Sequence, residues 1–450
     1  MSLVRKGAGV FLGNWTALPL QFLTGVLLAR MLGAEGRGML ALFAAGITLL
    51  AGLGQFGLPN AAAFLVRREI ANERTLVAGH LLVTLAFTLV IAGALFAGEA
   101  LVWRLLFEGV RPDRWMIPLV LVTLPLNMVN TYMGMLALAQ GRAADYARQT
   151  VGLGVLTALF TVALVGATGA GIAGGMLAVA LANAVNTVLV GARLLRATKG
   201  QVVAVSGATL RRMLALGFQN YWVSIGGLVF KRIDTFLVQG FLGTAAVGYY
   251  AVARVPFDAV LTVPRALTGL VVGEASAAGD AGAGPIVARV TRNVLWLMLL
   301  AVAPIAAGAP WVVPWLYGAD FAASVPSLGL LLAAAVLFGA AISLQPYFVG
   351  IGRPWINSAC TLGSGVASVG LGLWLIPLLG IEGNALASLA GAALFFVLQA
   401  ALYVHSTSAR WSELCRLDAG EVAGLRRRVR DRLLRRRQPV RAGGGQAVHS

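Results

Sequence analysis

The chain has 450 residues, of which 59% are hydrophobic and only 12% are charged, and its formal net charge is +18. Soluble domains average roughly 45–50% apolar and about 25% charged residues, so this composition excludes a water-soluble globular protein. The two cysteines imply neither a disulfide framework nor a metal site, because one lies in an apolar block and the other in the C-terminal tail.

The apolar residues form long blocks, each near or above the roughly 20 residues that a helix needs to cross about 30 Å of hydrocarbon. In chain order, the predicted membrane spans are 10–31, 38–66, 75–97, 115–139, 148–167, 170–192, 213–242, 246–271, 288–312, 326–350, 355–378 and 381–404. Several blocks are rich in glycine, which suits close packing between membrane helices. The sequence therefore predicts an all-α polytopic membrane protein of about twelve transmembrane helices.

Lys and Arg residues near helix ends indicate which loops stay in the cytoplasm. If the N-terminus is inside, the cytoplasmic loops and the tail hold most of the 35 Lys and Arg residues. The opposite side holds only Arg30, Arg37, Arg104, Arg111 and Arg114. We therefore expect both termini on the cytoplasmic side of a bacterial inner membrane.

The basic run from Arg426 to Arg437 is dense enough to suggest a contact with nucleic acid. However, Leu425, Val429 and Leu433 recur in this part of the tail at helical spacing, as in segments that lie on an anionic membrane surface. We expect the membrane, and no nucleic acid, as the partner of the tail.

Two other patterns favour structural roles. Residues 52–57 match the GxGxxG dinucleotide fingerprint, but they lie inside an apolar span with no strand before them, so helix packing or a break before Pro59 is expected. His80 in the third span could relay protons, although a packed or hydrogen-bonded histidine is the commoner case. No cofactor, metal or catalytic site is predicted.

The sequence repeats itself at a shift of about 210 residues, as many transporters do. The matching segments are 32–33 with 242–243, 141–142 with 352–353, and 171–178 with 380–387. Six spans per half give both halves the same orientation, related by an axis along the membrane normal.

We predict four parts of the chain on this basis. They are a six-helix lobe at 1–193, a basic cytoplasmic linker at 194–212, a second six-helix lobe at 213–405 and a basic cytoplasmic tail at 406–450. Two lobes that face each other leave a central cleft, and rocking of the lobes gives alternating access.

Charged side chains inside a membrane span are costly and usually face a cavity or a partner. Here they are concentrated in the seventh and eighth spans, at Lys231, Arg232, Asp234, Arg254, Asp258 and Arg265. At about 100° per residue, the three in the eighth span fall within about 40° of one another, and Asn220, Lys231 and Asp234 share about 60° of the seventh. We expect these two stripes to face one another or the cleft.

The first lobe has uncharged polar residues at related places, namely Asn14, Gln21, Thr24, Thr48 and Gln55. At the repeat shift, Gln21 corresponds to Lys231 and Thr24 to Asp234. The same faces are therefore polar in both lobes, but only the second lobe is charged. Asn14, Gln21, Gln55 and Asn220 join the candidate cavity residues.

The four cations at these positions outnumber the two carboxylates. Because arginine presents a planar fork that matches phosphate oxygens, the surplus favours an anionic, phosphate-bearing substrate. Asp234 and Asp258 are candidates for coupling to an ion or to the membrane potential. The alternative is that Lys231 with Asp234, and Arg254 with Asp258, only neutralise one another at helical spacing.

Four segments resemble the polysaccharide-transport flippases, which are the O-antigen and capsule exporters of the multidrug/oligosaccharidyl-lipid/polysaccharide superfamily. They are LARMLGAEGRGMLAL (28–42), GLGQFGLPNAAAFLVRRE (52–69), FKRIDTFLVQGFLGTAAVGYYAVARVPFDAVLTVPRAL (230–267) and IPLLGIEGNALASLAGA (376–392). The likeness covers roughly residues 5 to 405.

This resemblance implies a V-shaped bundle with a central cavity lined mainly by spans 1, 2, 7 and 8. It also implies a transporter, not an enzyme, for a polyprenyl-pyrophosphate-linked oligosaccharide such as an O-antigen, capsule or exopolysaccharide unit. Lys231, Arg232, Arg254 and Arg265 would then contact the pyrophosphate, and enzymes of polysaccharide biosynthesis would be further partners. Flippases of the peptidoglycan precursor also use cavity arginines in the first lobe, where this chain offers only Arg30 in spans 1 and 2.

Three other functions remain as alternatives, and a flippase of the peptidoglycan precursor is the first of them. A cation-coupled multidrug exporter of the same superfamily would favour carboxylates for cationic drugs, but the first two spans as predicted contain no Asp or Glu. A membrane polysaccharide polymerase or ligase generally needs a large external loop, and the longest predicted one, at 98–113, is short.

Overall fold

The computed structural model describes residues 3–68, 70–97, 115–407 and 409–416, and every element in these ranges is helical. The elements of the first half are α1 (Leu3–Gly54), α2 (Leu58–Arg67), α3 (Glu73–Ala97), α5 (Met116–Ala139), α6 (Ala143–Thr161), η1 (Val162–Ala167) and α7 (Gly171–Ala197). Those of the second half are α8 (Gly207–Leu242), α9 (Thr244–Val260), α10 (Thr262–Tyr317), η2 (Ala319–Ser324), α11 (Val325–Gly350), α12 (Trp355–Leu379), α13 (Ile381–Thr407) and α14 (Trp411–Cys415).

Nine helices among the described residues are long and apolar enough to cross a membrane. The prediction of an all-helical polytopic membrane protein is thus confirmed. Two predicted spans merge into the single helix α1, which changes direction at Gly33. The 56 residues of α10 would measure about 84 Å if straight, so this helix cannot be one span. The charged helices α8 and α9 are not among the nine.

The two halves share their turns as well as their sequence repeat. Glycines with positive φ angles recur in matched pairs, with 67° and 81° at Gly33 and Gly243, 71° and 72° at Gly141 and Gly352, and 59° and 64° at Gly171 and Gly380. Side chains other than glycine rarely adopt this backbone conformation. The repeat in the sequence is therefore a repeat of helix-ending turns, and the fold consists of two six-helix lobes.

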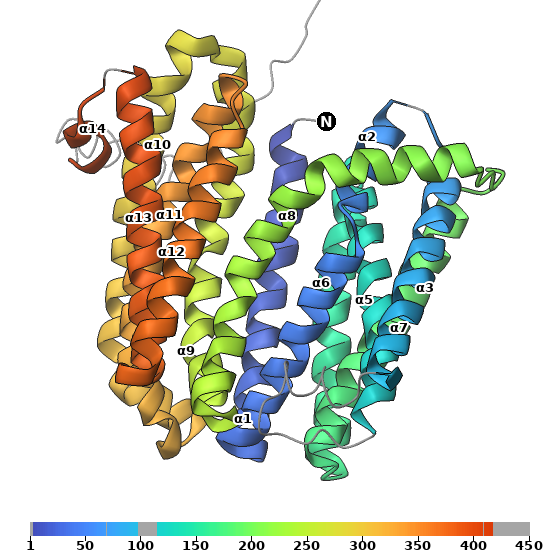
Figure 1. Cartoon of the computed structure of the whole chain (residues 1–450), viewed down its shortest axis with the longest axis horizontal. Coiled ribbons are helices and arrows are strands. Elements are labelled where there is room, and N and C mark those ends of the chain that lie inside the picture. The colour runs from blue at the N-terminus through green and yellow to red at the C-terminus, as the bar shows by residue number, and fades with distance from the viewer. Residues whose placement is uncertain (1–2, 69, 98–114, 408, 417–450) are drawn as a thin grey trace, which may run out of the picture.

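Figure 1 shows α10 to α13 as one group of helices and α2, α3, α5, α6 and α7 as the other, with α1, α8 and α9 between them. α8 begins at Gly207, inside the predicted linker, and its Met213 packs with side chains of α2, α3 and α5. The same helix then descends toward α9. The proposed lobe boundaries remain a prediction.

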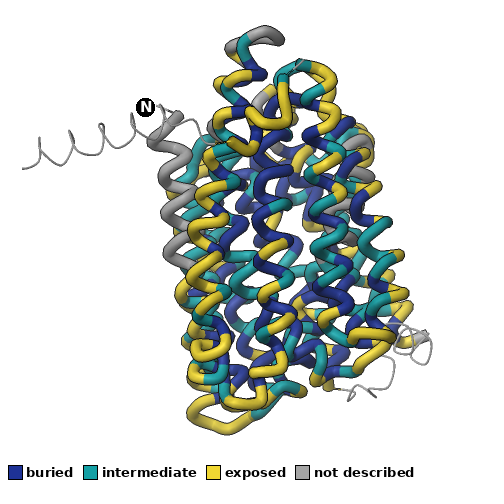
Figure 2. Tube along the Cα trace, turned by 90° about the vertical axis from the view of Figure 1, so that its left-hand side faces the viewer, coloured by how far each residue is buried: buried dark blue, intermediate teal, exposed yellow. Residues whose placement is uncertain are grey.

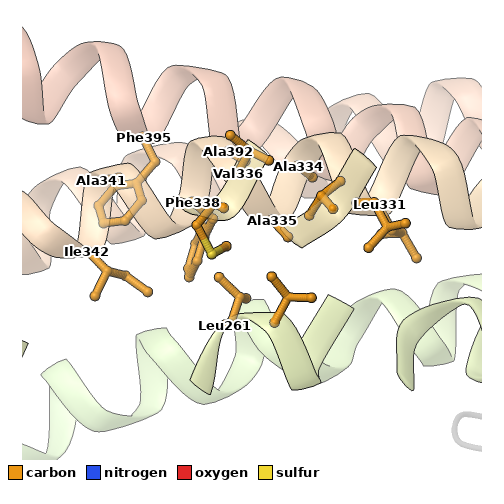
Figure 3. Packing of buried hydrophobic residues seen from close by; sticks show 14 of the residues in the cluster. Leu261, Leu331, Ala334, Ala335, Val336, Phe338, Ala341, Ile342, Ala392 and Phe395 are labelled. Atoms are coloured by element: carbon orange, nitrogen blue, oxygen red, sulfur yellow. The ribbon is translucent and has the colours of Figure 1, made fainter. Parts of the chain in front are cut away.

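The second lobe has the larger apolar core, which joins α9, α10, α11 and α13. In Figure 3, Phe338 of α11 and Phe395 of α13 lie near one another, with ring centroids 5.2 Å apart, and Leu261 faces them from the break between α9 and α10. Figure 2 shows exposed residues along the outer helix faces. Large apolar side chains such as Leu300 (74% exposed) and Trp311 (74%) lie there, as on a lipid-facing surface.

α1 and α9 approach to backbone contact at one end of the bundle. A Cβ atom on Gly38 would lie 1.9 Å from the Thr244 carbonyl oxygen, and one on Gly248 would lie 1.9 Å from that of Ala34. At the same end, Arg30 donates hydrogen bonds to the carbonyl oxygens of Trp315 and Leu316 at the end of α10. These contacts close the two lobes against each other there.

The two patterns given structural roles behave as expected. α1 ends at Gly54 and α2 begins at Leu58, so the pattern at 52–57 consists of the last residues of α1 and a helix break at 55–57, with no strand before it. His80 is 1% exposed and stacks on Tyr132, with ring centroids 3.9 Å apart. It is a packed histidine.

Candidate functional site

Asp234 of α8 is the centre of a charged network between α8 and α9. Its side chain forms an ion pair with Arg254 of α9 and accepts a hydrogen bond of 2.8 Å from the Tyr250 hydroxyl. The backbone N–H of Thr235 donates to its other carboxylate oxygen at 2.7 Å. Asp234 is 8% exposed. A carboxylate buried this deeply persists because the cation and these donors satisfy its oxygens.

Arg254 also reaches the second candidate carboxylate. Its Nε atom lies 3.6 Å from an oxygen of Asp258, one helical turn along α9, and its guanidinium lies 5.7 Å from the ring centroid of Phe257. The side chain of Asp258 is 46% exposed, against 12% for Asp234. Arg254 and Asp258 thus lie close enough to neutralise one another, as in the alternative. However, the closer partner of Arg254 is Asp234 on the neighbouring helix α8.

A cavity of about 160 Å³ lies between α1 of the first lobe and α8 and α9 of the second. Three arginines line it, Arg37 from α1, Arg232 from α8 and Arg254 from α9. Asp258 is the carboxylate that lines it. The other lining residues are small, apolar or hydroxylic: Ala41, Ala44, Thr235, Val247, Tyr250, Ala251 and Val255.

A second cavity lies inside the second lobe, on the other side of Arg254. Its volume of about 50 Å³ leaves room for a few water molecules and is too small for a sugar. Asp234, Arg254, Asp258 and Arg265 line it, together with Ser368, Asn384 and Ser388 of α12 and α13. Arg254 and Asp258 border both cavities, so they connect the space between the lobes with the interior of the second lobe.

The residues predicted from the sequence divide into four sets. Arg232, Arg254 and Asp258 line the cavity between the lobes, whereas Asp234 and Arg265 line the cavity inside the second lobe. Gln21 is exposed on α1 and Gln55 lies half-buried in the break after α1, and neither lines a described cavity. The side chains of Asn14, Asn220 and Lys231 fall outside the described residues.

Arg37 is the site residue that sequence reasoning missed. The sequence placed it among the external residues and offered only Arg30 as an arginine of spans 1 and 2, but the structure places Arg37 inside α1 and on the wall of the cavity. α1 turns at Gly33, five residues before the predicted second span begins. The repeat contains the missed signal, because Arg37 corresponds to Val247, which lies inside the predicted eighth span at 246–271.

Comparison with known proteins identifies the family and the fold. Residues 3–267, more than half of the chain, match the family described as polysaccharide biosynthesis protein. None of the curated proteins matches the sequence.

Solved membrane transporters share the fold. The inward-facing conformation of a multidrug resistance MATE family transporter of the MOP superfamily is 16% identical, has a TM-score of 0.70, and the match covers 88% of this chain and 96% of that one. An outward-facing conformation of such a transporter has 18% identity, a TM-score of 0.59 and coverages of 90% and 96%. The lipid II flippase MurJ in an inward closed conformation has 12% identity, a TM-score of 0.71 and coverages of 90% and 88%. The chain is therefore a multi-pass membrane protein with the MOP superfamily fold, and it belongs to the polysaccharide biosynthesis protein family.

Proposed function

We propose that the chain translocates a polyprenyl-pyrophosphate-linked oligosaccharide, such as an O-antigen, capsule or exopolysaccharide unit, across the bacterial cytoplasmic membrane. The observation that carries this proposal is the cavity between the lobes, where Arg37, Arg232 and Arg254 meet from three helices around one carboxylate, Asp258. Guanidinium groups match phosphate oxygens in geometry and stay charged in a membrane protein. A cationic drug would meet three like charges there.

Alternating access follows from the closed end of the bundle. Arg30 and the contact between Gly38 and Gly248 seal one end, which the distribution of Lys and Arg residues assigns to the external side. An external end that is closed corresponds to an inward-facing state. The TM-score is also higher with the inward-facing than with the outward-facing MATE structure. The cavity of about 160 Å³ is smaller than an oligosaccharide, so the lobes must separate to admit one.

The orientation in the membrane is part of the proposal. The N-terminal end of α1 and helix α14 lie at the same end of the bundle in Figure 1. We place this end in the cytoplasm, where the basic tail can contact anionic lipids and enzymes of polysaccharide biosynthesis can deliver the substrate.

Asp258 is the better of the two coupling candidates. Asp234 is held by an arginine, a tyrosine hydroxyl and a backbone N–H, whereas Asp258 is more exposed and borders both cavities. A substrate phosphate that binds Arg254 would compete with both carboxylates, and Asp258 is the more exposed of the two. We therefore expect the Asp258→Asn variant to lose most of the pH dependence of transport. Equal pH profiles of variant and parent would contradict this assignment.

Reconstituted transport tests the proposal directly. The purified chain is placed in liposomes with a labelled short-chain polyprenyl-pyrophosphate oligosaccharide on one side, and its arrival on the other side is measured by accessibility to a membrane-impermeant glycosidase. Wild-type protein should transfer the label and protein-free liposomes should not. A parallel arm with a lipophilic cationic dye tests the drug-exporter alternative, and transport of the dye but not of the lipid-linked sugar would overturn the proposal.

A further inference from the structure

A second concave site lies at the end of the bundle opposite the closed one. It is a groove of about 690 Å³ between the first three turns of α8 and the break that separates α1 from α2. The α8 residues that line it recur at intervals of three and four, from Gly207 to Phe218, so they form one stripe along the helix. Eleven residues of helix give this stripe a length of about 17 Å. It shares no lining residue with the two cavities around Arg254.

The walls of the groove are apolar, with one cation. Leu210, Leu214 and Phe218 provide most of the α8 wall, and Phe56 faces them from the helix break. Arg211 lies toward the beginning of the stripe and is exposed. Among the residues that the structure describes, no carboxylate lies within ion-pair distance of Arg211.

The surrounding charge favours an anion. Residues 193–212 contain five Lys or Arg residues and no Asp or Glu. This segment ends α7 and begins α8, at the end of the bundle where α8 crosses the first lobe in Figure 1. An apolar groove with a cation near one end, in a region of positive potential, fits an anionic lipid with its phosphate at Arg211 and its hydrocarbon chain toward Phe218.

Phe56 is held in the groove by an unusual backbone conformation. Its φ angle is 45°, the one positive φ among the described residues other than glycine. The ring packs on Tyr221, with centroids 5.4 Å apart, and on Phe87 at 6.1 Å. A strained conformation persists only where the surrounding structure enforces it, and such positions are frequent in ligand sites. The helix break therefore keeps an aromatic ring on the wall of the groove.

We propose that this groove is the loading site for the polyprenyl pyrophosphate part of the substrate. The inference rests on the proposed function, because it takes the occupant to be the molecule that the cavity translocates. The same helix connects the two sites, with Arg211 at the groove and Arg232 at the cavity. A pyrophosphate that first binds Arg211 from the cytoplasmic leaflet can move along α8 to the cavity, while the isoprenoid chain stays in the bilayer.

The test is photo-crosslinking of the full chain in nanodiscs of neutral phosphatidylcholine. The probe is a polyprenyl pyrophosphate with a diazirine in its first isoprene units, and mass spectrometry maps the labelled residues. We expect labels within 207–218 or at Phe56. Arg211→Ala should reduce labelling about tenfold, the effect of losing one charge-assisted hydrogen bond. Ala215→Trp, which fills the groove, should reduce it by a similar factor.

Two matched controls lie on the same helix outside the groove. Arg212→Ala removes the neighbouring charge, and Ala208→Trp adds the same bulk at an exposed position that does not line the groove. Both should label as the parent does. If either control loses as much labelling as its partner variant, the effect is not specific to the groove and the proposal is wrong.

Competition identifies the occupant. Excess unlabelled polyprenyl pyrophosphate should displace the probe, whereas equal mole fractions of phosphatidylglycerol or of uncharged polyprenol should displace it at least tenfold less. Equal displacement by phosphatidylglycerol would make the groove a site for bilayer lipid and would overturn the proposal. Equal displacement by polyprenol would show that the pyrophosphate contributes nothing to binding at Arg211, and this result would also overturn the proposal. Arg254→Ala separates this inference from the proposed function, because it should stop translocation and leave labelling of the groove intact.

Discussion

Both lobes contain hydrogen-bonded amide side chains, but the second lobe also contains buried charges. In the first lobe, the side-chain N–H groups of Asn130 donate to Asn183 and Thr187, and Asn186 donates to Asn130 at 3.0 Å. Gln149 donates to the Asn130 carbonyl at 2.6 Å. All of these groups are neutral. In the second lobe, Gln399 of α13 likewise donates to Asn357 of α12 at 3.1 Å. That lobe also holds the ion pair of Arg254 and Asp234, with Asp258 and Arg265 on the same cavity.

The difference indicates where function lies. Neutral amides join membrane helices at little cost, since both partners are satisfied and no charge is taken out of water. A buried ion pair carries a large desolvation penalty and is seldom the most stable solution for a helix contact. Charges retained in a membrane interior therefore indicate transport chemistry. We expect changes in the charged network around Arg254 to act on transport and changes in the neutral amide network around Asn130 to act on stability.

The largest effect is expected from Arg254→Ala. It leaves the buried carboxylate of Asp234 without its cation, which costs about 3–5 kcal/mol in comparable pairs. It also removes one of the three arginines of the cavity. We expect transport in liposomes to fall to background, together with a lower melting temperature in detergent.

A double variant separates the two consequences. Arg254→Met with Asp234→Asn removes both charges, so most of the lost stability should return. Transport should stay absent, because the substrate phosphate still lacks its partner. Recovery of transport in this double variant would show that Arg254 is only a structural counter-charge.

The next largest effect is expected from Gly38→Leu. The new side chain meets the backbone of α9 at Thr244, so the ends of the lobes beside Gly38 and Gly248 can no longer close. We expect transport to fall about tenfold and a cysteine placed near Gly38 to become accessible to a membrane-impermeant thiol reagent. Gly46→Leu is the matched control in the same helix, because nothing lies within 4 Å of the Cβ position of Gly46. An equal loss in the control would point to a general effect of leucine in α1.

Arg30→Ala tests the same closed end more gently. The variant loses the hydrogen bonds to the last carbonyl groups of α10, worth about 1 kcal/mol for an exposed side chain. That energy corresponds to a change of about two- to fivefold in the ratio of closed to open molecules. We expect to see this change in the distances between spin labels on α1 and α10. Arg353→Ala, an exposed arginine at the opposite end, should leave the distribution unchanged. An unchanged distance distribution in Arg30→Ala would show that Arg30 does not stabilise the closed end.

The smallest effect is expected from Asn186→Ala in the first lobe. It removes one hydrogen bond between neutral side chains, and such bonds in membrane helices average about 0.6 kcal/mol. The melting temperature should fall slightly, and the rate of transport per folded molecule should match the parent. Loss of transport at unchanged stability would contradict the division of roles between the amide network and the charged network.

Much of the fold could be predicted because a few residues have strong physical constraints. Long apolar blocks must be helices in a membrane, and glycines repeated at one shift mark turns that other residues cannot make. The cost of charge in a membrane also pointed to α8 and α9. The same reasoning could not choose between the two carboxylates as partner of Arg254, because that choice depends on how closely α8 and α9 pack.

In the first lobe, the sequence could not predict which residues of α1 face the second lobe. A helical stripe of polar residues does not tell which side of the helix faces the partner lobe, and Gln21 is exposed but lines no described cavity. Arg37 looked like a loop residue because the helix turn at Gly33 was placed too late. Only the close contact of α1 with α9 brings it to the second lobe.

Arg37 provides the most direct test of the central claim, that arginines of both lobes form one anion site. The measurement is the initial rate at which Arg37→Gln transfers a labelled polyprenyl-pyrophosphate oligosaccharide in liposomes, normalised to folded protein. The account predicts a rate at least tenfold below that of the parent, with a normal melting temperature and with Arg353→Gln at the parental rate. A parental rate in Arg37→Gln would contradict it.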